Sequence, residues 1–195
     1  MITAYSVKVK ESKYKKELNI KPVEIIKLNT YLLYADVVEY TQMAAKLGVI
    51  KSFKLLQTLY SNIDHISHKY SLHKIDLIGD CYSIASMYPG CVEETNQLNR
   101  VIKAAKEIQR TVNELAKQEH FKVRIGIHRG EVYWAKIGNS KRYDIFGEHV
   151  RIAQELQNFC VPDRIIISQN VKIEDKELQK SVKELSEYSF MSYFI

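Results

Sequence analysis

Two aspartates lie next to apolar segments, where they could together hold a divalent cation. Asp36 ends the segment YLLYAD, and Asp80 lies within the segment IDLIGDCYSI. A carboxylate beside an apolar segment has to be solvated, paired or bound to a cation. On adjacent strands, two carboxylates would offer the oxygen ligands that Mg²⁺ and Mn²⁺ take. The alternative is that one aspartate caps a helix and the other stabilises a turn.

The segment that follows Asp36 is a candidate phosphate-binding site. Val37, Val38, Glu39, Tyr40 and Thr41 lead from a predicted strand into a predicted helix. Backbone N–H groups at a helix start point outward, where they can donate to phosphate oxygens. A metal pair, a helix start of this kind and a basic residue together suggest nucleotide chemistry.

Alternating strands and helices must position these residues. Apolar, β-branched and aromatic residues predict strands at 29–38, 73–79, 81–88, 123–128, 131–138, 164–168 and 188–195. Apolar residues three or four apart predict helices at 41–70 and 93–117. We expect a third helix at 148–159 and a polar helical stretch at 172–185. The dipeptides Gly79-Asp80 and Arg129-Gly130 predict tight turns between neighbouring strands. The sequence thus predicts an α+β domain in which long helices pack on a mainly antiparallel sheet.

Composition narrows the class of protein. The chain has 195 residues, of which 46% are hydrophobic, and its formal net charge is +6, as expected of one globular domain. Its three cysteines are too few for a disulfide framework and fit a reducing cytoplasm. The N-terminus lacks the apolar stretch of a secretory signal, and no apolar run is long enough to cross a membrane.

Most of the positive charge lies at the N-terminus. Residues 1–27 carry seven lysines and three glutamates, so they contribute +4 of the total +6. The charge therefore sets a basic leader, residues 1–28, apart from a main domain, residues 29–195. The leader could contact nucleic acid, an acidic membrane surface or a partner, but a solvated terminus explains it as well. Because basic residues and stacking aromatics do not cluster after residue 27, we do not expect nucleic-acid binding.

Four segments in order resemble the signature segments of class III nucleotidyl cyclases. They are ADVVEYT (35–41), KIDLIGDCY (74–82), VRIGIHRGEV (123–132) and RYDIFGEHV (142–150). The resemblance spans roughly residues 29–195 and implies a ferredoxin-like cyclase fold. It also implies that two such domains pair head to tail, as a homodimer or a heterodimer, and build active sites across their interface.

The resemblance assigns roles to individual residues. It implies that Asp36, Asp80 and the Val37 carbonyl hold two Mg²⁺ or Mn²⁺ ions, which activate the ribose 3′-hydroxyl and neutralise the departing pyrophosphate. It implies that Val38, Glu39, Tyr40 and Thr41 bind phosphate through their backbone, and that Arg124 contacts the triphosphate. His128 resembles a structural histidine of the family. The substrate would be a nucleoside triphosphate and the product a 3′,5′-cyclic monophosphate.

The other half of the family's active site matches less well. Arg151 and Glu155 stand where the family has an asparagine and an arginine, and Glu155 reverses the charge needed at the transition state. Arg151 is the candidate replacement; the alternative is an ordinary i,i+4 ion pair between Arg151 and Glu155. Near the C-terminus Glu187 falls close to a family lysine position, for which Lys183 could substitute only if the loop were rearranged.

Asp76 and Asp144 occupy the two base-reading positions. Asp144 follows the adenylyl pattern, whereas Asp76 is closer to the glutamate of the guanylyl pattern. Two carboxylates do not select one base, so purine and pyrimidine substrates both remain open.

Other candidate residues have weaker roles. We expect His65 and His68 to lie on a solvated helix face rather than in a zinc site, because the sequence places no further ligand beside them. The resemblance makes Tyr133 and Trp134 candidates for the dimer interface, and packing within one domain is the equal alternative.

Two functions follow from these residues. The first is an active nucleotidyl cyclase that uses Asp36 and Asp80 with two divalent ions. The second is a degenerate cyclase-fold subunit that supplies the metal and phosphate half-site to a heterodimer, or that only binds nucleotide and regulates.

Overall fold

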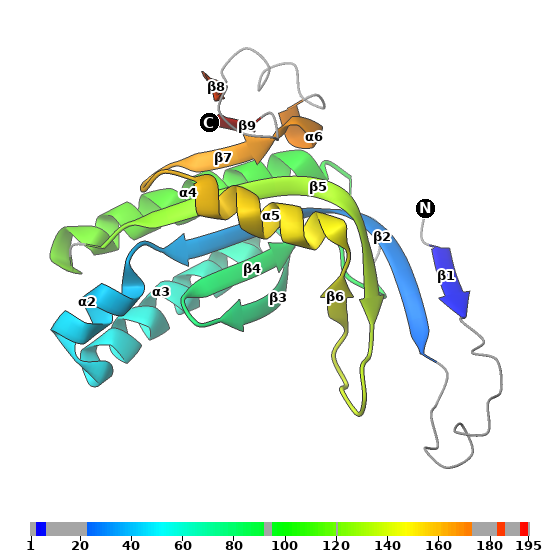
Figure 1. Cartoon of the computed structure of the whole chain (residues 1–195), viewed down its shortest axis with the longest axis horizontal. Coiled ribbons are helices and arrows are strands. Elements are labelled where there is room, and N and C mark those ends of the chain that lie inside the picture. The colour runs from blue at the N-terminus through cyan, green and yellow to red at the C-terminus, as the bar shows by residue number, and fades with distance from the viewer. Residues whose placement is uncertain are drawn as a thin grey trace.

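The computed structural model describes residues 3–6, 23–91, 95–119, 121–172, 183–185 and 192–194. Its nine described strands form one sheet in the order β3-β4-β2-β5-β7-β9-β8, with β1 also paired to β2 and β6 to β5 (Figure 1). The strands are β1 (Thr3–Ser6), β2 (Glu24–Val37), β3 (His73–Ile78), β4 (Cys81–Ala85), β5 (Val123–Ala135), β6 (Asp144–Phe146), β7 (Ile165–Ser168), β8 (Lys183–Leu185) and β9 (Ser192–Phe194). The helices are α2 (Tyr40–Leu47), α3 (Val49–Lys69), α4 (Gln97–Glu119), α5 (Glu148–Phe159) and α6 (Gln169–Lys172).

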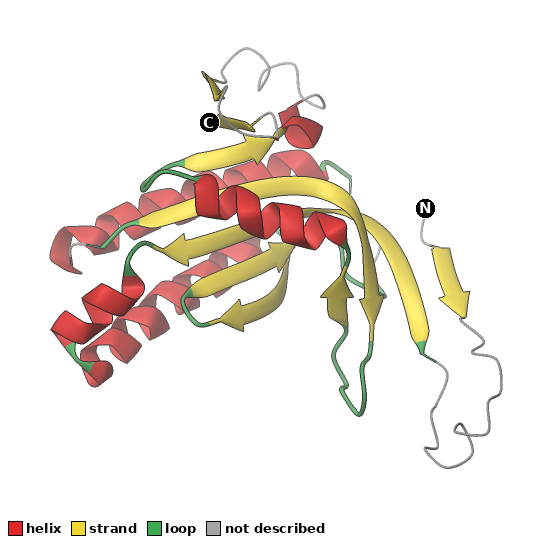
Figure 2. Ribbon diagram, in the orientation of Figure 1, coloured by secondary structure: helices red, strands yellow, loops and turns green. Residues whose placement is uncertain are grey.

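The predicted fold class is confirmed. Of the described strand pairs only β5–β7 is parallel, so the sheet is mainly antiparallel. Helices α3 and α4 lie behind the sheet and α5 crosses in front of it (Figure 2). The strand order β3-β4-β2-β5, with α3 and α4 in the connections, is the ferredoxin-like β-α-β-β-α-β arrangement.

Strand β2 is buried on both faces, which explains its nearly continuous apolar sequence. Tyr31, Leu33 and Ala35 point into the core under α3 and α4. The alternate residues Leu32 and Tyr34 point into a second core, to which Ala153 of α5 belongs. Because β2 is central, both cores fix the position of the strand end that carries Asp36.

The predicted hairpin at Arg129-Gly130 is wrong. Residues 123–135 form one continuous strand, and Gly130 pairs with Thr30 of β2. A Cβ atom at position 130 would lie 2.1 Å from Cγ of His149 on α5. Gly130 therefore permits α5 to approach the sheet. In the sequence alone, a glycine with this packing role looks the same as a glycine that marks a turn.

Several predicted boundaries also change. The helix predicted at 41–70 is two helices, because Gly48 adopts a positive φ of 79° between them. Strand β2 begins at Glu24, so the predicted boundary between leader and domain at residue 28 falls inside this strand. Residues 183–185, placed in the predicted helix 172–185, form strand β8 instead.

The hairpin at Gly79-Asp80 is confirmed, with β3 and β4 on either side. The terminal strand predicted at 188–195 is described only at residues 192–194, as β9. Among the described residues, the helices are all too short or too polar to cross a bilayer.

Two histidines link β5 to α5 inside the protein. Nδ1 of His128 lies 2.7 Å from Oγ of Ser168, and its Nε2 lies 2.9 Å from Nδ1 of His149. Burial and then the nearby His149 lower the pKa of His128 from its usual 6.5 to about 4. The folded chain therefore holds this imidazole neutral.

We expect His128 to make the protein sensitive to acid. The unfolded chain takes up a proton on this imidazole near pH 6.5, whereas the folded chain does so only near pH 4, so stability is lost as pH falls between these values. The free energy of unfolding should fall by about 2 kcal/mol between pH 7.5 and pH 5 through this group. Urea unfolding at both pH values should show a smaller fall for His128→Asn. An equal fall in both proteins would contradict the assignment.

Candidate nucleotide and metal site

The fold brings Asp36 and Asp80 to the same end of two neighbouring strands. Asp36 lies near the end of β2, is 9% exposed, and pairs in register with Cys81 of β4. Asp80 occupies the turn between β3 and β4, where its carbonyl accepts a hydrogen bond from the Val37 amide at 3.4 Å. The turn is also held from α3, since the hydroxyl of Tyr60 donates to the Gly79 carbonyl at 3.3 Å.

The charge of Asp36 acts on the neighbouring Asp80 carboxyl. Burial, and then the charge of Asp36, raises the pKa of Asp80 above its usual value. The same two causes raise the pKa of the Cys81 thiol to about 12, so this cysteine is a neutral neighbour and not a nucleophile. Desolvated negative charge of this kind is what a divalent cation would neutralise.

The donor atoms fit a hard divalent cation. Two carboxylates and the Val37 carbonyl are all oxygen donors, as Mg²⁺ and Mn²⁺ prefer. No cluster of three or more His, Cys, Asp or Glu side chains that could hold a metal occurs in the described part of the chain. A metal at this position would therefore depend on backbone and substrate oxygens as well as on the two aspartates.

Arg124 lies against this pair. Its Nε and Nη2 atoms donate to Oδ2 of Asp36 at 3.0 and 2.9 Å, and its Nη1 donates to the Asn158 carbonyl at 3.1 Å. Gln157, which is buried on α5, donates to the same Asp36 oxygen at 3.3 Å. In this structure Arg124 thus neutralises the candidate metal ligand, and Gln157 is a positioning contact that sequence reasoning missed.

The predicted phosphate-binding segment forms a sharp junction between β2 and α2. Glu39 adopts a left-handed conformation, with φ 55° and ψ 32°, and precedes the first residue of α2. For a residue other than glycine this conformation costs about 1 kcal/mol. The Val38 amide donates to the Lys122 carbonyl at 2.9 Å, so it is engaged within the protein. The amides at the start of α2, Tyr40 and Thr41, are the ones placed to meet a phosphate.

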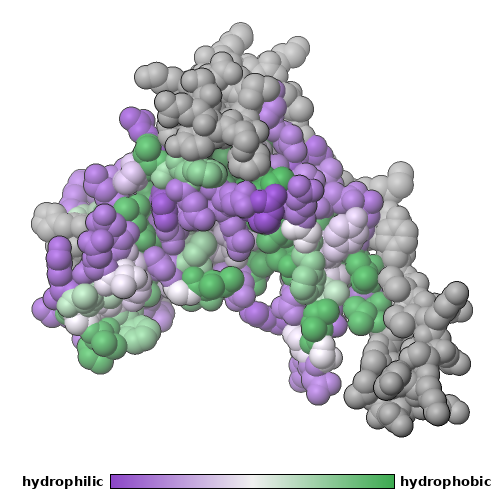
Figure 3. Space-filling view, in the orientation of Figure 1, coloured by the Kyte–Doolittle hydropathy of each residue, from purple (hydrophilic) through white to green (hydrophobic). Residues whose placement is uncertain are grey.

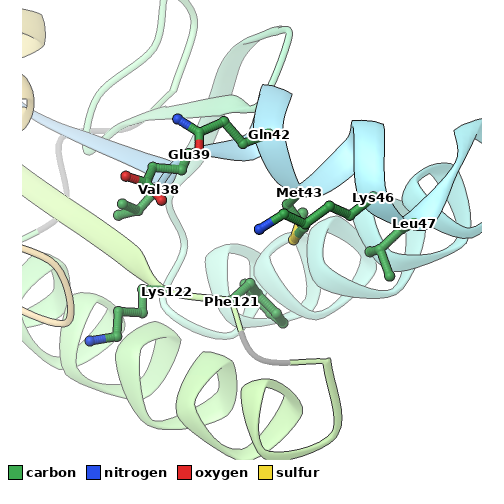
Figure 4. Close-up of a pocket in the computed structure, with 8 residues that line it drawn as sticks. All are labelled: Val38, Glu39, Gln42, Met43, Lys46, Leu47, Phe121 and Lys122. Carbon is green, nitrogen blue, oxygen red and sulfur yellow. The ribbon is translucent and has the colours of Figure 1, made fainter.

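A pocket of about 400 Å³ lies beside this junction. Figure 4 shows Lys46 and Gln42 reaching toward it from α2, with Lys122 on the opposite side. The full lining is Val38, Glu39, Gln42, Met43, Lys46, Leu47, Phe121 and Lys122. Sequence reasoning missed both lysines. The i,i+4 spacing of Gln42 and Lys46 puts both side chains on one face of the helix and could have indicated Lys46. Lys122 follows α4 in the sequence, and only the folding of the chain brings it to the pocket.

The base-reading candidates lie at the edge of the sheet. Asp76 is on β3 beside a β-bulge, and its Oδ1 accepts a hydrogen bond from the Leu77 amide at 2.9 Å. Asp144 is the first residue of β6. Arg142, two residues before it, lies 3.7 Å from Oδ1 of Asp76, so the segment that carries Asp144 comes close to β3. No local pattern in the sequence indicates this contact.

Arg151 is engaged on its own helix. Its Nη1 atom contacts Oε1 of Glu155, and its Nη2 lies 3.8 Å from Oε1 of Glu148. The i,i+4 pair expected as the alternative to a catalytic role is therefore present. The pair is exposed, so it is weak and can open when a stronger anion approaches.

Trp134 does not lie on the surface, so of its two expected roles the structure bears out packing within the domain and not a place at the dimer interface. Its side chain is fully buried and meets Tyr88 edge-on, with ring centroids 5.1 Å apart. The neighbouring Tyr133 points to the other face of β5 and is 39% exposed. His65 and His68 are both exposed on α3, as expected.

Comparison with known proteins gives the family of the chain. Residues 27–191 match the family described as adenylate and guanylate cyclase catalytic domain. Soluble guanylate cyclase gcy-31 of Caenorhabditis elegans is 30% identical over 151 residues, which cover 75% of this chain and 22% of that protein. Adenylyl cyclase X E of Drosophila melanogaster is 30% identical over 179 residues, covering 84% and 16%. The chain thus spans less than a quarter of the length of these relatives.

Solved structures show the same fold. The guanylyl cyclase domain of the RhoGC fusion protein of Blastocladiella emersonii superposes with a TM-score of 0.75 at 18% identity, covering 87% of this chain and 97% of that one. The adenylyl cyclase CyaB of P. aeruginosa gives a TM-score of 0.74 at 16% identity, covering 87% and 94%. With the match over residues 27–191, the chain belongs to the class III adenylyl and guanylyl cyclase catalytic domain family.

Proposed function

We propose that this protein is a nucleotidyl cyclase, which converts a nucleoside triphosphate to a 3′,5′-cyclic monophosphate and pyrophosphate. The observation that carries the proposal is the placement of Asp36, near the end of β2, and of Asp80, in the turn that leads into the neighbouring strand β4, beside the β2–α2 junction. Relatives named as guanylate and adenylyl cyclases support the reaction class. The three cysteines form no disulfide, which is consistent with action in the cytoplasm.

In this proposal the two aspartates and the Val37 carbonyl hold two Mg²⁺ or Mn²⁺ ions. Such ions, when bound, lower the pKa of the 3′-hydroxyl and stabilise negative charge on the leaving pyrophosphate. The amides of Tyr40 and Thr41 donate to phosphate oxygens, and Lys46 adds positive charge beside them. Lys122 adds to it when its exposed ion pair with Asp163 opens. Arg124 exchanges its hydrogen bonds with Asp36 for bonds to the triphosphate. Asp76 and Asp144 read the base, and which base they accept stays open.

The proposal requires a second cyclase-type domain, because the residues of α5 would act on a nucleotide held by a partner. Exposed apolar side chains suited to such a contact lie at the end of β3 and on the β5–β6 hairpin. They are Leu77, Ile78, Tyr133, Ile137 and Phe146. The partner is either a second copy of this chain or a different cyclase-type domain.

One experiment separates activity from mere binding. With Mn²⁺ and each of ATP, GTP, CTP and UTP, we expect the purified chain to release pyrophosphate from at least one nucleotide. Metal-dependent nucleotide binding without turnover would instead favour the second candidate, a subunit that supplies the metal and phosphate half-site to a heterodimer. The contact of Arg151 with Glu155 is the observation that favours this second candidate, because it neutralises the cation on α5.

We expect Arg151 to act at the transition state once nucleotide binds. Its exposed pair with Glu155 can break at little cost, and its guanidinium can then donate two hydrogen bonds to a phosphate. Arg151→Ala should lower turnover by about 10²-fold. Glu155→Gln, the matched control, should keep or raise the rate because it frees Arg151. An unchanged rate in Arg151→Ala would reduce Arg151 to a surface ion pair.

A further inference from the structure

An exposed apolar patch lies at the junction of α2 and α3. Val49, Ile50 and Phe53 are 67%, 69% and 64% exposed, although the same helix buries Leu55 and Leu56 directly afterwards. In Figure 3 hydrophobic surface gathers at this end of the molecule, at lower left. Gly48 creates the patch, because its positive φ breaks the helix and turns the first residues of α3 outward.

Lysines surround the patch, and the local sequence holds no acidic residue to balance them. Lys46, Lys51 and Lys54 are exposed, and the sequence has no Asp or Glu between Glu39 and Asp64. Within the described part of the chain, no ion pair engages any of these three lysines. Residues 40–63 therefore carry a net charge of +3 beside three protruding apolar side chains.

We propose that this patch, residues Val49 to Lys54, docks the protein on an anionic membrane surface. Apolar side chains that enter the interface and lysines that meet negative headgroups are the combination that such surfaces bind. A nucleic acid would use the lysines but leave Val49, Ile50 and Phe53 exposed to water. The start of α3, which carries the patch, lies apart from the β5–β6 hairpin in Figure 1. The proposal does not depend on catalytic activity.

Vesicle co-sedimentation of the full chain tests the proposal. Vesicles of equal parts phosphatidylcholine and phosphatidylglycerol should pellet the protein, and pure phosphatidylcholine vesicles should not. Ile50→Ser with Phe53→Ser should weaken binding by about 100-fold, because the loss of each apolar side chain should lower the affinity about tenfold. Lys51→Gln with Lys54→Gln should weaken it by about tenfold and reduce its salt dependence. Val161→Ser, which alters an exposed apolar residue elsewhere, is the matched control and should bind like the wild type.

A gain-of-signal variant keeps the test independent of any loss of folding. Phe53→Trp should show a blue shift of its fluorescence when anionic vesicles are added, because the indole enters the interface. No pelleting with anionic vesicles, or pelleting unaffected by the Ile50 and Phe53 exchange, would overturn the proposal. Sedimentation velocity without lipid measures whether the protein self-associates through the patch. If the wild type self-associates and the double serine variant does not, the patch binds a second copy and the membrane assignment is wrong.

Discussion

Asp80→Asn and Asp36→Asn are each expected to lower turnover by about 10³-fold, because each removes one of the two charges proposed to hold the metal ions. Both aspartates lie at one end of the β2–β4 pair, and the chain offers no third carboxylate in a described cluster to replace them. The measurement is pyrophosphate release under saturating Mn²⁺. Turnover within a few-fold of wild type in either variant would disprove the metal assignment.

The same two variants should differ in stability, which separates chemistry from folding. Asp36 accepts hydrogen bonds from Arg124 and Gln157, so Asp36→Asn should cost roughly 2 kcal/mol. Asp80 is a desolvated carboxyl beside Asp36, and its raised pKa means that ionisation at neutral pH destabilises the fold. Asp80→Asn should therefore keep or raise the thermal midpoint while it lowers turnover.

Metal binding gives a readout that does not need activity. At 100 times its dissociation constant, Mn²⁺ should raise the unfolding free energy of the wild type by about 2.7 kcal/mol. It should not do so for Asp36→Asn or Asp80→Asn. Asp163→Asn is the matched control: this aspartate has φ 60°, which asparagine also adopts, and among the described residues its carboxylate forms an ion pair only with Lys122. An equal shift in all four proteins would mean that Mn²⁺ binds elsewhere.

Gly126→Ala is expected to give the largest loss of stability among single exchanges outside the site. A Cβ at this position of β5 would lie 2.7 Å from the backbone N and Cα of Gln157 on α5. Backbone atoms cannot rotate away, so α5 would have to move off the sheet, at a cost of about 3 kcal/mol. The displacement would also carry Gln157 away from Asp36, so we expect turnover to fall together with stability.

Gly138→Ala is the control for Gly126→Ala. Gly138 has φ +60°, and a Cβ atom there would meet no described neighbour within 4 Å, so alanine should cost only about 1 kcal/mol, from backbone strain. Urea unfolding of the two variants measures the difference. If Gly126→Ala costs no more than Gly138→Ala, the close contact between β5 and α5 is not a constraint on the fold.

The sequence predicted those parts of the site that are formed by residues close together along the chain. The apolar run that ends at Asp36 and the Gly79-Asp80 turn signal both act over a few residues, and both led to the correct strands. Gly130 misled the prediction because its role depends on His149, which approaches it only when α5 packs on β5. The same holds for Trp134: its burial comes from Tyr88 and the second core, which sequence alternation alone does not place.

Contacts between distant segments account for the residues that sequence reasoning missed. Lys122 reaches the pocket beside Glu39 because Val37 and Val123 pair across β2 and β5. Gln157 reaches Asp36 because Gly126 lets α5 approach the sheet. Gln157 has no neighbour in sequence that marks it as part of a site. Lys122 directly precedes the segment that carries Arg124, but only the fold places it at the pocket. The register of the sheet, and not the local pattern, assembles this half of the site.

The most direct test of the proposed function is the identity of the product. Pyrophosphate release alone could also come from hydrolysis of the α–β bond, which leaves a linear monophosphate. Mass spectrometry of reactions with Mn²⁺ and each of the four nucleoside triphosphates separates the two, because the cyclic product is lighter by one water. We predict one 3′,5′-cyclic monophosphate for each pyrophosphate released from at least one nucleotide. A linear monophosphate as the only product, or no product from any of the four, would contradict the assignment of this chain as a self-sufficient nucleotidyl cyclase.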